Sequence, residues 1–139
     1  MAFLLDTSVI VALERARADL GSLLGETGDE PIAIAAVTAA ELLHGVHRAE
    51  SAVRRGQREA FVEGILALVP VLPMDLAVAR HHARIWSDLQ RHGLVIGAHD
   101  LIIAATALTH GLVVLTGNVR VFGRVEGLAV RQFPGGPTS

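Results

Sequence analysis

The sequence predicts an α/β fold in which helices cover both faces of a parallel sheet. Short apolar runs, typical of buried strands, alternate with segments whose apolar residues recur every three or four positions, as in helices. The chain has 139 residues and 51% of them are hydrophobic, which is enough for one domain with its own core. We expect a single domain over residues 1–133 and a disordered tail over residues 134–139 (PGGPTS).

Strands and helices are expected to follow each other along the chain. The expected strands are residues 2–5, 31–37, 69–74 (a short extended piece), 112–116 and, as a final edge strand, either 119–122 or 128–133. The expected helices are residues 8–16, a segment that opens at Thr38, 51–68, 75–92 and 96–111. Trp86 falls in the apolar stripe of the helix at 75–92, so we expect it in the core. The helix at 96–111 is apolar nearly all round, which predicts a position in the middle of the domain.

The stretch VTAAELLHG supports two interpretations of Glu41. Thr38 and Glu41 have the spacing of a capping box, in which each side chain bonds a backbone N–H at a helix start. Alternatively, the Glu41 carboxylate points away from the cap and helps to hold a metal ion. We expect Thr38 to cap the helix alone and Glu41 to turn toward Asp6 and Asp100.

Composition excludes several kinds of chemistry. The chain has no cysteine, which excludes disulfides, zinc–thiolate sites and thiol nucleophiles. All 12 basic residues are arginines, so P-loop and Schiff-base lysines are excluded too. The net charge of −2 differs from the broad basic surface of a passive nucleic-acid binder. No apolar run is long enough to cross a bilayer and no basic leader precedes the first strand, so we expect a soluble, cytoplasmic protein.

Three carboxylates are expected to meet at one edge of the sheet. Asp6 ends the first strand, and Glu41 and Asp100 are each placed in the first turn of a helix. Ligands of open parallel sheets bind at the carboxyl ends of the strands. Each acid alone would also suit a helix start, but three of them within ~4 Å would repel by a few kcal/mol per pair. A divalent cation, Mg²⁺ or Mn²⁺, would relieve this repulsion, and such ions favour phosphoryl transfer.

Four blocks of the sequence resemble a known family. The segments LLDTSVIVAL, TAAELLHGV, IGAHDLIIAATAL and LTGNVRVF, in this order and spacing, are similar to the conserved blocks of PIN-domain ribonucleases, in particular VapC-type toxins. The resemblance extends from Phe3 to about Phe133. It implies a PIN-like three-layer fold, a Mg²⁺-dependent endoribonuclease that cleaves RNA, homodimers, and inhibition by a cognate VapB-type antitoxin.

The resemblance also implies site residues. Asp6, Glu41 and Asp100 match the family's leading acidic positions and are the expected metal ligands, and Thr116 matches a threonine or serine near the site. Glu41 would serve as the third ligand or position the attacking water.

This sequence departs from the family at a fourth acidic position, where Asn118 and Val121 stand instead. Asn118 offers a neutral oxygen as a supporting group, and we do not expect two tightly held metals.

Two other functions compete with a nuclease. One is a phosphoacceptor signalling domain with Asp6 as acceptor, which the missing lysine and the absence of an acidic pair beside Asp6 disfavour. The other is a catalytically weak PIN fold that only binds RNA or antitoxin, which the missing fourth acid keeps open.

The arginine cluster and one histidine also have two interpretations. The cluster, Arg48, Arg54, Arg55 and Arg58, either guides an RNA backbone or forms a solvated face paired with Glu50 and Glu59. His99, beside Asp100, either touches substrate or is a loop residue at a helix start.

Overall fold

The computed structural model describes residues 1–134, without the side chains of Leu24 and Glu26. Residues 135–139 lie outside the described residues, so the expected disorder of the tail stays a prediction.

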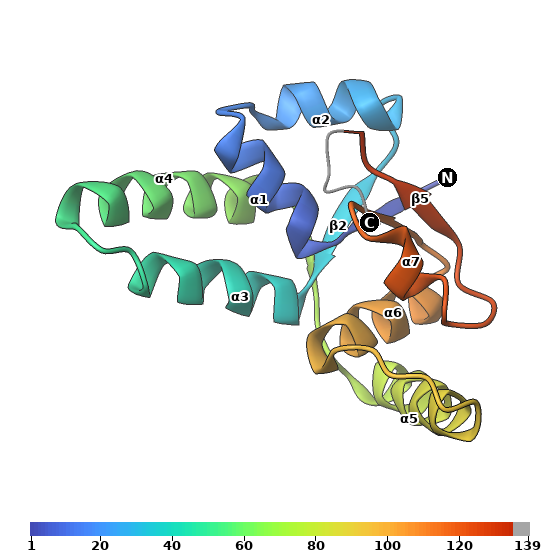
Figure 1. Cartoon of the computed structure of the whole chain (residues 1–139). Coiled ribbons are helices and arrows are strands. Elements are labelled where there is room, and N and C mark those ends of the chain that lie inside the picture. The colour runs from blue at the N-terminus through green and yellow to red at the C-terminus, as the bar shows by residue number, and fades with distance from the viewer. Residues whose placement is uncertain (135–139) are drawn as a thin grey trace.

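One parallel sheet of five strands runs through the described chain in the order β3-β2-β1-β4-β5 (Figure 1). The strands are β1 (Phe3–Leu5), β2 (Ile32–Ala35), β3 (Val71–Leu72), β4 (Val113–Thr116) and β5 (Val130–Gln132). The helices are α1 (Thr7–Arg15), α2 (Leu20–Thr27), α3 (Ala36–His47), α4 (Ala52–Leu68), α5 (Leu76–Arg91), α6 (Ala98–His110) and α7 (Val119–Phe122). The strand order reverses at β1, between β2 and β4, and ligands of open sheets bind at such a switch point.

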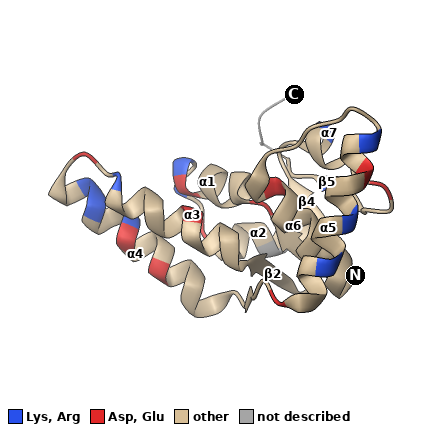
Figure 2. Cartoon of the chain, turned by 90° about the horizontal axis from the view of Figure 1, so that it is seen from below, with Lys and Arg blue, Asp and Glu red and all other residues tan. Residues whose placement is uncertain are grey.

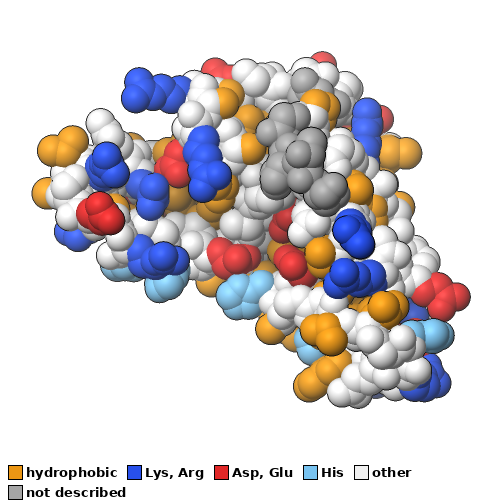
Figure 3. Space-filling model, viewed as in Figure 1, with side chains coloured by type: hydrophobic (Ala, Val, Ile, Leu, Met, Phe, Trp, Pro, Cys, Tyr) orange, Lys and Arg blue, Asp and Glu red, His pale blue; other side chains and the backbone are white. Residues whose placement is uncertain are grey.

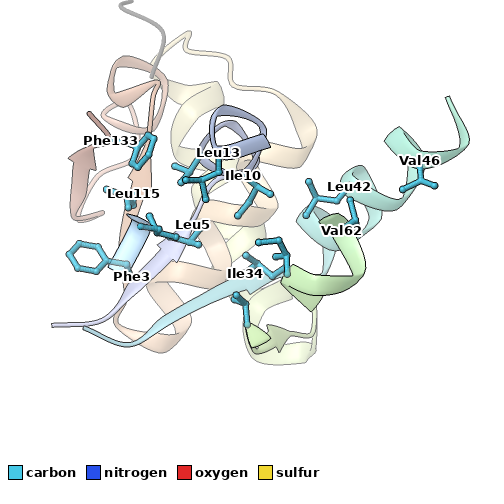
Figure 4. Packing of buried hydrophobic residues seen from close by; sticks show 14 residues of the cluster. Phe3, Leu5, Ile10, Leu13, Ile34, Leu42, Val46, Val62, Leu115 and Phe133 are labelled. Carbon is cyan, nitrogen blue, oxygen red and sulfur yellow. The ribbon is translucent and has the colours of Figure 1, made fainter. Parts of the chain in front are cut away.

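The sheet separates two hydrophobic clusters. Phe3 and Leu5 of β1 pack on the face covered by α1, α2, α3 and α4, whereas Leu4 packs on the face covered by α5, α6 and α7. Successive side chains of a strand point to opposite faces, so a strand buried on both sides is apolar throughout. Figure 4 shows the first cluster. The predicted three-layer α/β fold is therefore confirmed.

Helices α3 and α4 run side by side away from the sheet as an arm (Figure 1). Leu42 and Val46 of α3 face Val62 of α4 and extend the first cluster into the arm (Figure 4). Two backbone carbonyls at this end of α3 also accept side-chain bonds from α4: Arg58 Nη1 donates to the Gly45 oxygen over 3.1 Å, and Arg55 Nη2 to the Ala49 oxygen over 3.3 Å. The arm is thus fixed by packing and by two arginines.

Thr38 does not cap helix α3, so the expected single cap is wrong and so is the alternative of a capping box with Glu41. Helix α3 begins at Ala36 with Ala35 as its N-cap residue, because the chain passes from β2 into the helix without an intervening turn. Thr38 is therefore buried inside the helix, and no side chain caps α3. Glu41 lies in the second turn rather than the first.

The structure adds one helix, decides between the two candidates for the last strand, and places Trp86 elsewhere than expected. Helix α2 was not predicted. Of the two candidates for the last strand, residues 128–133 contain β5, whereas residues 119–122 form α7. Trp86 is 54% exposed, because the buried stripe of α5 consists of Val78, Ile85 and Leu89 and leaves Trp86 on another side.

No helix in the described part of the chain is both long enough and apolar enough to span a membrane.

Helix α5 has a side-chain cap that can be tested. The Asp75 carboxylate accepts the backbone N–H of Val78 over 3.0 Å, which satisfies one free donor at the helix start. Asp75→Ala should lower the free energy of unfolding by about 1 kcal/mol, measured by urea denaturation. Asp75→Asn is the control, because asparagine caps about as well as aspartate. Equal losses in both variants would contradict the capping role.

Candidate active site

The Asp6 carboxylate lies buried at the carboxyl end of the central strand β1. Its Oδ2 accepts hydrogen bonds from the hydroxyls of Ser8 and Thr116, each over 2.8 Å. These hydroxyl oxygens in turn accept the backbone N–H groups of Gly117 (3.1 Å) and Asn118 (2.9 Å). Among the described residues, no hydrogen bond engages Oδ1, which leaves that oxygen available to a ligand.

The Glu41 carboxylate is held at both oxygens. The Thr7 hydroxyl donates to Oε1 over 2.7 Å, and Nδ1 of His99 lies 3.4 Å from Oε2. The hydroxyls of Thr7 and Thr38 lie 3.3 Å apart. An ionised carboxylate only accepts hydrogen bonds, so the Thr7 hydroxyl donates its hydrogen bond to Glu41. The Thr38 hydroxyl then donates to the Thr7 oxygen. Thr38, expected as a cap, thus helps to orient Glu41 through Thr7.

Asp100 lies in the first turn of α6, as predicted, and is half-buried. Burial, and after it the charges of Asp6 and Glu41, raise the pKa of its carboxyl from 3.8 to about 6, and His99 opposes them. Carboxylates from β1, α3 and α6 therefore act on one another across one edge of the sheet. Figure 3 shows acidic side chains gathered near the middle of this face, with a histidine beside them.

The donor set suits a hard cation, although a three-ligand cage is not assembled. Among the described residues, no three His, Asp or Glu side chains lie close enough together to hold one metal ion. Nor does any described arginine pair with Asp6, Glu41 or Asp100, so their negative charge is not neutralised by a strong base. Carboxylate oxygens with unneutralised charge fit Mg²⁺ or Mn²⁺. The assignment of individual metal ligands stays a prediction.

Asn118 directly precedes the short helix α7 that follows β4, and Val121 lies within that helix. Asn118 is the N-cap residue of α7, but its side chain makes no capping hydrogen bond, and its backbone N–H bonds Thr116. Both residues are partly buried. Neither supplies the carboxylate that the family has in this block.

Two hydroxyl residues of the site were missed as functional groups. Thr7 and Ser8 were not among the expected site residues, yet Thr7 orients Glu41 and Ser8 orients Asp6. A usable signal was present, because both hydroxyls directly follow the acid that ends a buried strand.

Comparisons with known proteins agree with this geometry. A profile of the PIN domain matches residues 3–128. Ribonuclease VapC1 of Rickettsia felis is 39% identical over 132 residues, which cover 94% of this chain and 95% of that protein. The tRNA(fMet)-specific endonuclease VapC of Shigella flexneri is 30% identical over 133 residues, covering 96% of this chain and 98% of that protein. In the crystal structure of DNA-bound VapBC from Salmonella typhimurium, one chain superposes with a TM-score of 0.84 at 28% identity, covering 95% of this chain and 98% of that chain. The chain therefore belongs to the PIN-domain family and, within it, to the VapC-type ribonucleases, which are RNA-cleaving hydrolases.

Proposed function

We propose that this protein is a Mg²⁺-dependent endoribonuclease toxin, with Mn²⁺ as a possible substitute, and that a cognate VapB-type antitoxin keeps it inactive. The main support is that Asp6, Glu41 and Asp100 lie near enough to act on one another: burial, together with the charges of Asp6 and Glu41, raises the pKa of Asp100 to about 6. Relatives named as ribonucleases and VapBC complexes of similar fold are consistent with it. The homodimer expected from the resemblance belongs to the same proposal, and light scattering of the purified chain would check it.

Asp6 and Asp100 are the groups that would hold the ion. Asp6 offers the oxygen that the Ser8 and Thr116 hydroxyls leave open, and Asp100 offers a carboxylate destabilised by its acidic neighbours. When bound, the ion supplies positive charge that stabilises the oxygens of the transferred phosphoryl group. Asn118 is a supporting group through its bond to Thr116.

Glu41 is the group that would orient the attacking water. Thr7 and His99 engage both carboxylate oxygens, so the side chain is oriented before substrate arrives. Water adds to the phosphorus and one of its protons passes to Glu41. The P–O ester bond breaks, the leaving oxygen takes a proton from solvent, and Glu41 returns its proton to solvent.

A binding module is the second candidate. The missing fourth acid at Asn118 and Val121 favours it, because fewer carboxylates hold a cation less tightly. In that case the wild-type protein would bind RNA or antitoxin but would not cleave RNA at any concentration of Mg²⁺ or Mn²⁺.

Asp100→Asn tests the nuclease directly. Loss of this carboxylate should reduce Mg²⁺-dependent cleavage of a labelled RNA by at least ~10²-fold, because preorganised charge at the reacting group is lost. Glu63→Gln, on the exposed side of α4, removes the same charge elsewhere and should cleave normally. Cleavage by Asp100→Asn at the wild-type rate would show that Asp100 is not part of the site.

The same variant tests the charge repulsion in metal-free protein. The pKa of Asp100 is raised in the fold, so its favourable contribution is complete below pH 3.8 and is lost as pH rises through about 6. With EDTA, Asp100→Asn should therefore gain stability over wild type at pH 7.5 and about half as much at pH 5, because the loss in wild type begins at the unfolded-state pKa of 3.8. We expect about 1 kcal/mol at pH 7.5, because solvent screens this half-buried group. Urea unfolding at both pH values measures it, and an equal difference at both would contradict the repulsion.

Glu41→Gln separates a scaffold from a chemical role. Glutamine keeps an acceptor for the Thr7 hydroxyl but lacks the charge and cannot take a proton, so cleavage should fall by at least ~10²-fold. Stability should stay near that of wild type. The RNA cleavage rate of Glu41→Gln is measured in parallel with that of Glu63→Gln. A rate within a few-fold of wild type would show that Glu41 has only a structural role.

A further inference from the structure

A groove of about 470 Å³ leads from the acidic site along the arm of α3 and α4. Thr7 and Glu41 line it at the end nearest the acids, and α1, α3 and α4 supply its walls. Its apolar lining includes Ile10, Leu42 and Phe61. The groove is therefore continuous with the proposed catalytic centre.

Four arginines line this groove, but they do not share one role. Arg58 is engaged within the protein, because its Nε lies 3.4 Å from Glu14 Oε2 and its Nη1 donates to a backbone carbonyl of α3. Arg15, Arg48 and Arg54 are exposed and form no ion pair with any side chain that the structure describes. Three guanidinium groups are thus free to bind an anion along the groove. Figure 3 shows basic side chains around the arm, and in Figure 2 the ribbon is coloured as basic at the start of α4 and the end of α1.

The alternative of a solvated, internally paired face fits these arginines poorly. It requires ion pairs with Glu50 and Glu59, and neither acid pairs with an arginine among the described side chains. Glu14, the acid that does form such a pair, is neutralised by Arg58. The groove away from Glu41 therefore carries three unpaired positive charges against one unpaired acid, Glu50.

We propose that this groove binds the sugar–phosphate backbone of a single RNA strand and leads it to the acids. The proposal rests on the nuclease function and specifies how its substrate is held. A phosphodiester approaching three carboxylates is repelled, and a chain of net charge −2 offers no general attraction. Local guanidinium groups supply that attraction, since their planar fork binds phosphate oxygens in pairs.

The apolar lining favours a single strand over a duplex. In a duplex the bases are stacked inside and present mostly phosphates and hydroxyls, whereas a single strand exposes base faces that pack on apolar surface. Val11 and Phe61, which line the groove and are only partly buried, offer such surface. An acidic segment of the antitoxin would use the same charges, so the experiment has to separate these two occupants.

The test is RNA binding by the full-length chain in EDTA, where cleavage does not interfere. Fluorescence anisotropy of a short single-stranded oligoribonucleotide is measured across a salt series for wild type and for the Arg48→Gln/Arg54→Gln double variant. We expect the variant to bind about 10-fold more weakly at low salt, and the slope of log Kd against log salt to fall by about 1.4, since each phosphate contact on a single strand contributes about 0.7.

Two controls keep the result specific. Arg80→Gln/Arg91→Gln removes two exposed arginines of α5, on the other face of the sheet, and should leave affinity and slope unchanged. Arg48→Lys/Arg54→Lys keeps the charge and should retain the wild-type slope, which also guards against a folding defect. In the presence of Mg²⁺, the Gln variant should raise KM for the RNA with little change in kcat.

Unchanged RNA affinity and slope in the Gln variant would overturn the proposal. Loss of antitoxin binding with intact RNA binding would overturn it as well, and would make the groove a site for protein. RNA binding with the expected slope but without cleavage by wild type would refute the nuclease and leave this binding site standing.

Discussion

The buried carboxylate of Asp6 fixes the edge of the sheet at which the site lies. A buried charge is costly unless it is hydrogen-bonded, and here the bonds come from Ser8 of α1 and Thr116 of β4. Their hydroxyls also accept the backbone N–H groups of Gly117 and Asn118. One ionised group thus joins β1, α1 and the loop between β4 and α7, so the position of that loop depends on it.

Hydroxyl groups supply the hydrogen bonds that orient Asp6 and Glu41, and such bonds preserve the charge of the two acids. Hydroxyls of Ser8, Thr116 and Thr7 fix the carboxylates of Asp6 and Glu41 by hydrogen bonds, whereas an arginine would fix them by cancelling their charge. The charges that remain on Asp6 and Glu41 add to the effect of burial in raising the pKa of Asp100, so an ionised Asp100 is destabilised in the fold. Such strain is common at functional sites, where stability is given up for chemistry. A cation that binds there would regain stability as well as enable catalysis.

Strong hydrophobic patterns made the sheet and the buried helix predictable, and weaker patterns account for the errors. Helix α2 contains Gly21 and Gly25, which have low helix propensity, and it is held by burial of Leu23. In α5, the expected apolar stripe included Trp86, but the buried stripe lies on another side of the helix. A difference of one position in the sequence turns a side chain by about 100° around the helix axis. Thr38 matched a capping box in spacing, but the true helix start depends on how β2 ends.

Contacts between distant residues decided the rest of the site. The places of Asp6 and Asp100 were predictable because one follows a strand end and the other lies at a helix start, whereas Glu41 lies one turn further into its helix than expected. The bond from Thr116 to Asp6 spans 110 positions, and the spacing of residues in the sequence does not indicate it. The arginines illustrate the same limit. They form one cluster in sequence, yet Arg58 bridges α4 to α1 and α3 while Arg48 and Arg54 stay unpaired. Arg55 and Arg58 fix the arm, whereas Arg48 and Arg54 give the groove positive charge, a division that only the packing of the helices determines.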